Sequence, residues 1–408
     1  MHASRLARLL PLALMVLFAA APQPAAAAEP AAVELVESVP IETTLDHADL
    51  RDAADVWPAM LVQAHRTIDL AEFYAASAPG SRLEPVIAAL EAAAARGVRV
   101  RFLVDDGFAK HESETISRLA AGGRIEVRRI DMHARAGGIL HAKYFIVDGS
   151  DAFLGSQNFD WRSLTHIQEL GLRLHAAPLA GALADLFETD WALARGGDAG
   201  ARTRAHVAQK WPLVLGSGAA RMELTPVASP RGWLADEQLW DLPRIIALID
   251  GARRSVRVQL LTYSTQLHGG GSFDELDGAL RRAAARGVEV QLLVSDWCKR
   301  KGCIEGLQRL QAVPHVQVSL LSIPAWSGGF IPYARVAHAK YLVVDGERAW
   351  VGTSNWERDY FYASRNVGLI IQGGTLPARL DAFFADGWKS PYAALVDVAA
   401  HYEAPRTH

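Results

Sequence analysis

Apolar residues follow helical and extended patterns in an order that the chain repeats. Alanine-rich segments with helical spacing end at Gly97 and Gly287, and each precedes a short apolar run typical of a buried strand. Residues 95–105 and 285–295 share the pattern Ala-Arg-Gly-Val-x-Val-x-x-Leu-Val, so we expect equivalent helix–strand units.

Another pair of elements of the same kinds precedes each unit. Extended apolar segments at 67–74 and 255–263 both follow a helical pattern, which gives the order helix, strand, helix, strand in each half. This alternation favours α/β domains, in which helices cover a sheet.

Composition indicates where the two halves are joined. Residues 195–218 are rich in Gly, Ala and Arg and have weak periodicity, which is typical of a connection. We expect a first domain at 29–200, a linker at 201–215 and a second domain at 216–408, although residues 211–215 could already belong to the second domain.

A sharper repeat carries polar residues. The pattern His-x-Lys, four residues, Asp-Gly, and then Gly-x-x-Asn occurs once in each half. Its members are His141, Lys143, Asp148 and Asn158 in the first half and His338, Lys340, Asp345 and Asn355 in the second. A single His-x-Lys is weak evidence, because exposed His and Lys neighbours are common. Two complete copies in register indicate a site to which both halves contribute.

Strand geometry suggests what these residues do. Residues two apart share a face of a strand, so each copy presents an imidazole beside an ammonium. Asp148 and Asp345 each begin an Asp-Gly pair between two apolar runs, which predicts a β-hairpin. We count these aspartates among the catalytic motif residues, and we expect them to brace the turn and the polar network rather than to contact a substrate.

Small polar residues follow the second strand of each predicted hairpin. Ser156 and Asn158 in the first half, and Ser354 and Asn355 in the second, can donate hydrogen bonds to phosphate oxygens. A glycine-containing turn with a helix cap explains the same residues equally well.

Glu169 and Asn366 stand at equivalent positions beyond the two copies. Glu169 lies in an alternating run and is expected on a strand beside the first motif strand, where its carboxylate could orient one imidazole. Asn366 would orient the other imidazole without a negative charge, which would separate the two histidine pKa values. A surface salt bridge is the plainer explanation for Glu169.

Cleavage of a phosphodiester needs a nucleophile, cations that stabilise negative charge, and an acid for the leaving oxygen. Two histidines and two lysines supply these groups. One imidazole can form a phosphohistidine, the other can protonate the leaving alcohol and then activate water, and the lysines bind the oxygens. No metal or cofactor is expected, because the motifs lack a carboxylate cluster and Lys is a poor zinc ligand.

Charge and cysteine content add little to this picture. The formal net charge of −3 gives no overall attraction to polyanions, although residues 96–101 and 299–301 are locally basic. Cys298 and Cys303 bracket the second basic run. A disulfide between them is expected if the protein is exported, with two free thiols as the alternative.

The N-terminus has the pattern of a signal peptide. Arg5 and Arg8 precede an apolar run at 9–21 and small residues at 25–28, so we expect cleavage after Ala28. The apolar run is shorter than the roughly 20 residues that span a bilayer. A secreted or periplasmic protein without a membrane span in its mature form is expected.

The duplicated motifs resemble those of the phospholipase D superfamily over nearly the whole mature chain. Residues 154–165 and 352–361 more narrowly resemble the branch of the animal lysosomal phospholipase-D-like proteins and the poxvirus envelope phospholipases. The resemblance implies two α/β/α sandwich domains with mixed sheets, related by pseudo-twofold symmetry. It also implies that His141 is the nucleophile and His338 the general acid, although the sequence alone permits the reverse.

The resemblance leaves the substrate open among phospholipids and single-stranded nucleic acid. Phospholipid is the favoured expectation, because the chain has no basic surplus and because Trp326, Phe330 and Tyr333 precede the second motif. The same aromatic residues could stack on bases or pack in the core. Binding to a phosphate-bearing surface without catalysis is less favoured, since both motifs are intact. The oligomeric state is not indicated.

Overall fold

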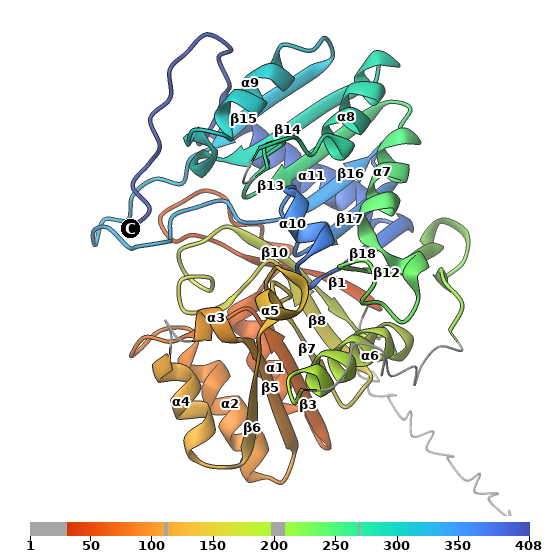
Figure 1. Ribbon diagram of the computed structural model, residues 1–408. Helices are drawn as coiled ribbons and strands as arrows, with labels where there is room; N and C mark the ends of the chain where they lie inside the picture. The colour runs from red at the N-terminus through yellow and green to blue at the C-terminus, as the bar shows by residue number, and fades with distance from the viewer. Residues whose placement is uncertain (1–30, 110–112, 197–208, 268–269) are drawn as a thin grey trace, which may run out of the picture. The chain divides into compact units, whose positions relative to one another are not determined.

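The computed structural model describes residues 31–109, 113–196, 209–267 and 270–408 (Figure 1). The expected signal peptide at 1–28 and most of the expected linker lie outside these ranges. Residues 32–408 form one unit, which contains both halves of the repeat.

The first half is built on a mixed sheet of order β2-β1-β10-β8-β7-β3-β5-β6. Its strands are β1 (Val33–Ser38), β2 (Arg51–Asp52), β3 (Thr67–Glu72), β5 (Arg99–Asp105), β6 (Ile125–Ile130), β7 (Tyr144–Val147), β8 (Asp151–Gly155) and β10 (Glu169–Leu174). β3, β5 and β6 run parallel, whereas β7, β8 and β10 continue the sheet antiparallel. The short strands β4 (Ala75–Ala76) and β9 (Phe159–Asp160) pair separately.

Helices cover both faces of this sheet. On one face, α1 (Ala53–Val62), α2 (Glu84–Ala95) and α4 (Ser113–Ala121) bury apolar residues against the strands. On the other, α6 (Ala177–Leu193) packs through Leu179, Leu183 and Phe187. The shorter helices α3 (Asp106–Ala109) and α5 (Met132–Ala136) follow β5 and β6.

The second half repeats this plan. Its sheet has the order β11-β12-β18-β17-β16-β13-β14-β15-β19. The strands are β11 (Leu213–Leu215), β12 (Met222–Ser229), β13 (Ser255–Leu260), β14 (Glu289–Ser295), β15 (Val316–Leu321), β16 (Tyr341–Val344), β17 (Arg348–Gly352), β18 (Asn366–Gly373) and β19 (Ala393–Leu395). From β12 to β15 the order matches that from β1 to β6 strand for strand, as the duplication predicts.

The helices of the second half are arranged similarly. They are α7 (Asp241–Asp250), α8 (Glu275–Ala285), α9 (Ile304–Gln311), α10 (Arg358–Tyr362) and α11 (Leu376–Lys389), with 3-10 turns at Gly218–Ala220, Glu237–Leu239 and Asp296–Lys299. α7, α8 and α9 share one core with the sheet, while α11 buries Leu380, Phe383 and Phe384 on the opposite face. The α/β prediction with two layered halves is therefore confirmed.

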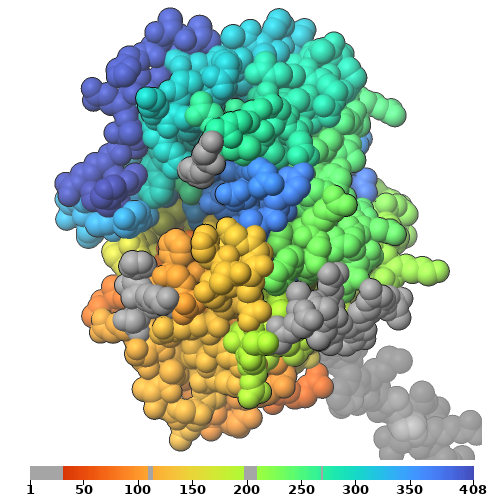
Figure 2. Space-filling model, viewed as in Figure 1, coloured from red at the N-terminus to blue at the C-terminus, as the bar shows by residue number. Residues whose placement is uncertain are grey.

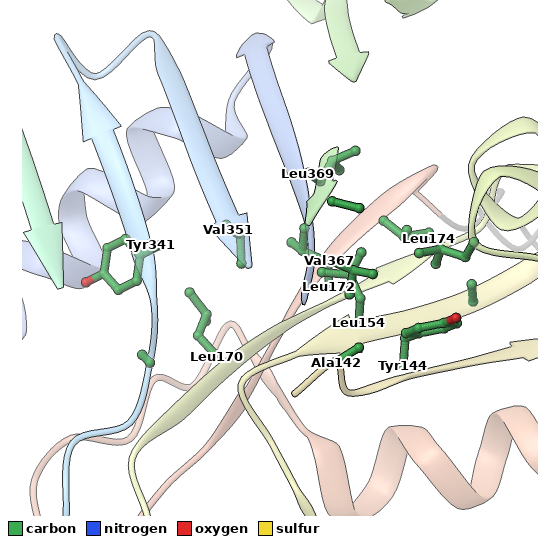
Figure 3. Packing of buried hydrophobic residues seen from close by; sticks show 14 of the residues in the cluster. Ala142, Tyr144, Leu154, Leu170, Leu172, Leu174, Tyr341, Val351, Val367 and Leu369 are labelled. Atoms are coloured by element: carbon green, nitrogen blue, oxygen red, sulfur yellow. The ribbon is translucent and has the colours of Figure 1, made fainter. Parts of the chain in front are cut away.

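One apolar cluster joins the two halves. It contains residues from the inner faces of both sheets as well as from α6 and α11. Figure 3 shows Leu170 and Leu172 of β10 beside Val351 of β17 and Val367 of β18. Because strands of the two sheets pack on each other here, the strand ends that carry the motifs are held next to one another.

Both Asp-Gly pairs form the predicted hairpins. Asp148 and Gly149 connect β7 to β8, and both have positive φ, at 53° and 71°. Asp345 and Gly346 connect β16 to β17 with φ of 59° and 69°. Consecutive residues with positive φ are typical of a tight hairpin turn, here with three residues between the paired strand ends Val147 and Asp151, and likewise between Val344 and Arg348.

Two details differ from the expectations. His141 and Lys143, like His338 and Lys340, lie in extended segments just before β7 and β16 rather than within those strands. β11, in the segment expected as linker, pairs antiparallel with β12. No helix among the described residues is long and apolar enough to cross a membrane.

Candidate active site

The two motif segments meet across the boundary between the halves. The backbone N–H of His141 donates to the carbonyl of Arg365 over 2.9 Å, and that of His338 donates to Gln168 over 2.8 Å. Each motif therefore pairs with the residue that precedes Asn366 or Glu169 in the opposite half. This crossed pairing is what brings the two copies into one site.

Asn366 fixes the proton position on His141. The amide nitrogen of Asn366 donates to the carbonyl of Tyr360 over 2.7 Å, and its Oδ1 accepts from the Thr353 hydroxyl over 2.9 Å. Oδ1 therefore faces His141 Nδ1, 3.0 Å away, and Nδ1 must carry the hydrogen. This tautomer leaves the Nε2 lone pair of His141 free to attack phosphorus.

Glu169, in the first half, makes the equivalent contact with the histidine of the second half. Its Oε1 hydrogen-bonds to Nδ1 of His338. Both side chains are buried, and the Glu169 carboxyl is completely enclosed. Ser163 donates to Glu169 and favours its ionised form. The prediction that Glu169 would lie beside the motif strand of its own half is therefore wrong, because β8 separates β10 from β7 and the partner is the histidine of the second half.

Burial makes the protonation of the two histidines different from that in water. Burial and the ammonium groups of Lys143 and Lys340 hold the pKa of His141 well below its usual 6.5. His141 is therefore neutral at neutral pH, as a nucleophile must be. Burial raises the pKa of Glu169 to about 8, so the Glu169–His338 pair holds one shared proton near neutrality. That proton is available for a leaving oxygen.

The two lysines are buried beside the histidines. Lys143 Nζ donates to the carbonyl of His141, and Lys340 Nζ donates to that of His338, each over 2.6 Å. Burial lowers the pKa of Lys143 to about 7 and lowers that of Lys340 as well. An anionic phosphate between them would favour both ammonium forms, so the site is adapted to a negatively charged group.

The small polar residues after each hairpin differ in whether their polar atoms have hydrogen-bond partners. The Ser156 hydroxyl accepts from the backbone of Leu170, and the Ser354 hydroxyl donates to Asp241 of α7, so both hydroxyls are engaged within the fold. Asn158 and Asn355 are buried, and each Oδ1 lacks a hydrogen-bond partner among the described residues. Because Oδ1 only accepts hydrogen bonds, these atoms would meet a donor, and a phosphate oxygen would need the Nδ2 side of either amide.

The two motif aspartates are at the far ends of the motif strands. Asp148 accepts from the backbone N–H groups of His65, Arg66 and Thr67 at 2.7–2.9 Å. Asp345 does the same for residues 253–255. The structure does not bring them together with the histidines, and they hold the hairpin to the strand beside it, as expected from the sequence.

Three residues near the histidines were not identified from the sequence. Glu72 ends β3, is buried beside Lys143, and favours the ammonium form of that lysine. The ring of Phe73 lies 5.1 Å from that of His141 and 4.9 Å from Lys143 Nζ. Tyr360 packs on the other side of His141, with ring centroids 4.8 Å apart. None belongs to the repeated pattern, so sequence comparison of the halves carries no signal for them.

Contacts in the structure show the state of the two cysteines and of the first basic run. Cys298 and Cys303 form a disulfide. Arg101, in the first basic run, is buried and paired with Asp69 and Glu188, so it serves the fold. No group of three or more His, Cys, Asp or Glu side chains in the described part of the chain is placed to hold a metal ion.

The aromatic residues before the second motif contact their own chain. Phe330 and Tyr333 are about half exposed, at 47% and 53%. Phe330 lies under the guanidinium of Arg406, and Tyr333 stacks on the ring of His408. Trp326 packs against His166. None of these contacts involves His141 or His338.

Comparison with known proteins agrees with this geometry. The family model described as "Cardiolipin synthase, PLD-like domain" matches residues 59–191 and 245–388, one match in each half. The chain is 31% identical to the 5'-3' exonuclease PLD3 of Macaca fascicularis, over 94% of this chain and 84% of the relative. It is 29% identical to phospholipase D Z of Dictyostelium discoideum, over 88% and 90%.

A solved structure shows the same fold. Phosphatidylserine synthase of Haemophilus influenzae superposes with a TM-score of 0.61 at 12% identity, covering 84% of this chain and 85% of that one. Duplicated domain matches, similarity along nearly the whole chain and a common fold agree with one another. The chain therefore belongs to the phospholipase D superfamily, as a phosphodiesterase with a PLD-like domain in each half.

Proposed function

We propose that this protein is a 5'-3' exonuclease that acts on single-stranded nucleic acid. The observation that carries the proposal is the similarity, over 94% of the chain, to relatives named 5'-3' exonuclease PLD3. The site supports it with two buried His–Lys pairs, whose ammonium groups suit an anionic phosphate.

The geometry supports a two-step reaction. In the first step His141 Nε2 attacks phosphorus, a P–N bond forms, and the P–O bond to the leaving alcohol breaks. The leaving oxygen takes the proton held by the His338–Glu169 pair. In the second step His338 accepts a proton from water, whose oxygen attacks phosphorus and releases His141. Lys143 and Lys340 neutralise the added negative charge in both steps.

The surroundings of His141 favour a polar chain over an acyl chain. A hollow of about 370 Å³ next to Tyr360 has a mixed lining, in which His133, Arg358 and Asp359 bring charged or polar groups beside the apolar Ile139 and Leu267. Lipid acyl chains need apolar walls, whereas sugar, phosphate and base edges suit polar ones. Tyr360 also offers a ring on which a terminal base can stack.

Phospholipid remains the second candidate substrate. It is supported by the relative named phospholipase D Z, which is 29% identical over 88% of the chain. The half-exposed rings of Phe330 and Tyr333 fit a contact with a lipid surface. Both candidates share the site chemistry and differ in what surrounds the scissile phosphate.

A parallel assay separates the two candidates. The purified protein, with EDTA present, is incubated with single-stranded DNA labelled at its 3' end and, separately, with phosphatidylcholine and phosphatidylglycerol vesicles. Progressive shortening from the 5' end is expected, together with inactivity of the His141→Ala variant. Release of headgroup without DNA shortening would overturn the nuclease proposal, and a 5' end-blocked oligonucleotide that is degraded equally fast would overturn the polarity.

We also propose that the mature protein works outside the cytoplasm, secreted or in the periplasm. The pattern of residues 1–28 supports export, and the Cys298–Cys303 disulfide suits an oxidising compartment. N-terminal sequencing of the protein from its native source tests this: a start at Glu29 is expected, and a retained Met1 would contradict it.

A further inference from the structure

The disulfide loop 298–303 forms one wall of a hollow beside the active site. The hollow has a volume of about 490 Å³, and Arg300, Lys301 and Gly302 of the loop line it together with Ser264 and Glu357. Nothing in the two-step reaction uses this loop, and the first half has no cysteines with which to close a similar one. The proposed reaction therefore does not explain the loop.

This hollow is continuous with the one beside His141. Gln266, Leu267 and Glu357 line both hollows, so they form one groove. At its other end the groove reaches Tyr360, whose ring packs on His141. Figure 2 shows the surface of α10, in blue, bordering the gold surface of α5 along this part of the molecule.

The charges on the loop are available to a ligand. Arg300 is 49% exposed and has a loose contact of 3.5 Å with Glu357. Lys301 is exposed, with no carboxylate within 4.0 Å among the residues that the structure describes. Arg358, 45% exposed, lies along the same groove and contacts Asp359 over 3.4 Å. Arg300 and Arg358 thus share the groove with the carboxylates of Glu357 and Asp359. Lys301 adds a positive charge that no carboxylate of the described residues offsets.

The loop is held firmly in this position. The disulfide closes it, and Cys303 Sγ also contacts the carbonyl of Tyr263 at 2.8 Å. Both sulfurs are buried, and the backbone N–H of Gly302 donates to Glu305 over 2.7 Å. A loop that is already ordered loses little entropy when it binds a ligand, so its charges can contribute to affinity.

We propose that the loop Lys299–Lys301 is a second phosphate-binding subsite, which receives the backbone of a single-stranded nucleic acid beyond the scissile phosphate. The inference rests on the proposed nuclease function. Aromatic stacking near the reacting end combined with spaced cations is the arrangement that binds single strands without sequence preference. A phospholipid, with its single phosphodiester, would leave this subsite unused.

The test uses the variant Arg300→Gln/Lys301→Gln in the full-length mature protein. Kinetic constants are measured on a ten-residue oligodeoxynucleotide and on bis(p-nitrophenyl) phosphate, which has one phosphodiester and no neighbouring phosphate. A matched control is Arg309→Gln/Lys389→Gln, which removes the same two charges from exposed positions on α9 and α11.

The variant should raise KM for the oligonucleotide about tenfold and leave the small diester unchanged. Its log KM should also depend less steeply on log salt, with a slope smaller by about 1.4 for two lost contacts to a single strand. The control should match the wild type on both substrates. Equal oligonucleotide KM in variant and wild type would overturn the subsite while the nuclease function stands. A wild type that cleaves the small diester but not the oligonucleotide would overturn the nuclease function and the subsite with it.

Discussion

The Glu169–His338 pair offers the sharpest test of how the site works. Glu169→Gln keeps the size of the side chain and removes its ionisable group. A hydrogen bond to a charged group contributes about 1.5–3 kcal/mol, and each 1.4 kcal/mol changes a rate tenfold. We therefore expect kcat to fall by about 10- to 150-fold, with little change in KM, because the buried Glu169 carboxyl acts through its hydrogen bond to His338.

The same substitution should move the pH profile in a known direction. The pKa of Glu169 is raised to about 8, so the pair keeps its proton below that pH and loses it above. In the variant the proton must reside on His338 alone, and burial with the nearby ammonium groups holds the pKa of His338 well below 6.5. The alkaline limb of kcat should therefore move from near pH 8 to below 6.5.

The profile is measured at saturating substrate, because a bound phosphate favours both lysine ammonium groups and leaves the pair as the group that titrates. Glu91→Gln, a substitution of a 42% exposed glutamate on α2, is the control. An unchanged alkaline limb, or kcat within twofold of the wild type, would refute the assignment of the proton to this pair.

Three further substitutions have defined outcomes. Asn366→Asp places a carboxylate 3.0 Å from His141 Nδ1, so the pKa of His141 should rise and the acid limb of kcat/KM should move to higher pH; an unmoved limb would count against His141 as the neutral nucleophile. Glu72→Gln removes the carboxyl that favours the Lys143 ammonium, whose pKa is about 7. A further fall of one unit would lower kcat/KM at pH 8 about tenfold, and equal values across pH 6–9 would refute this role. Asp190→Asn leaves the buried Arg365 guanidinium uncompensated and should lower the free energy of unfolding by about 3–5 kcal/mol in urea titrations, whereas a loss under about 1 kcal/mol would contradict it.

The repeat in the sequence was sufficient to predict the layered halves and the meeting of the two motifs. Residues two apart on an extended segment, as His141 and Lys143 are, must share a face whether or not the segment pairs as a strand. The turns at Asp148 and Asp345 followed equally from local chemistry, because Asp-Gly tolerates the positive φ that a tight hairpin requires. Both features depend on neighbours in the chain.

The partners of the histidines could not be predicted in the same way. Glu169 and Asn366 each act on the opposite half, and that exchange depends on how the two sheets pack, which local patterns do not encode. Glu72 and Tyr360 are further cases, since each occurs in one half alone and reaches the site through the tertiary fold. The groove along the disulfide loop likewise depends on tertiary contacts, since the fold brings Arg300 within 3.5 Å of Glu357, 57 residues away.

Detection of the covalent intermediate tests the central claim most directly. ³²P-labelled bis(p-nitrophenyl) phosphate, whose p-nitrophenolate leaves without a proton from His338, is mixed with the His338→Asn variant in EDTA and quenched in alkaline denaturant, in which phosphohistidine survives. The account predicts labelled protein in this variant, with the label on the peptide that contains His141, and none in His141→Asn. Label on another residue, or labelling that His141→Asn does not abolish, would contradict it.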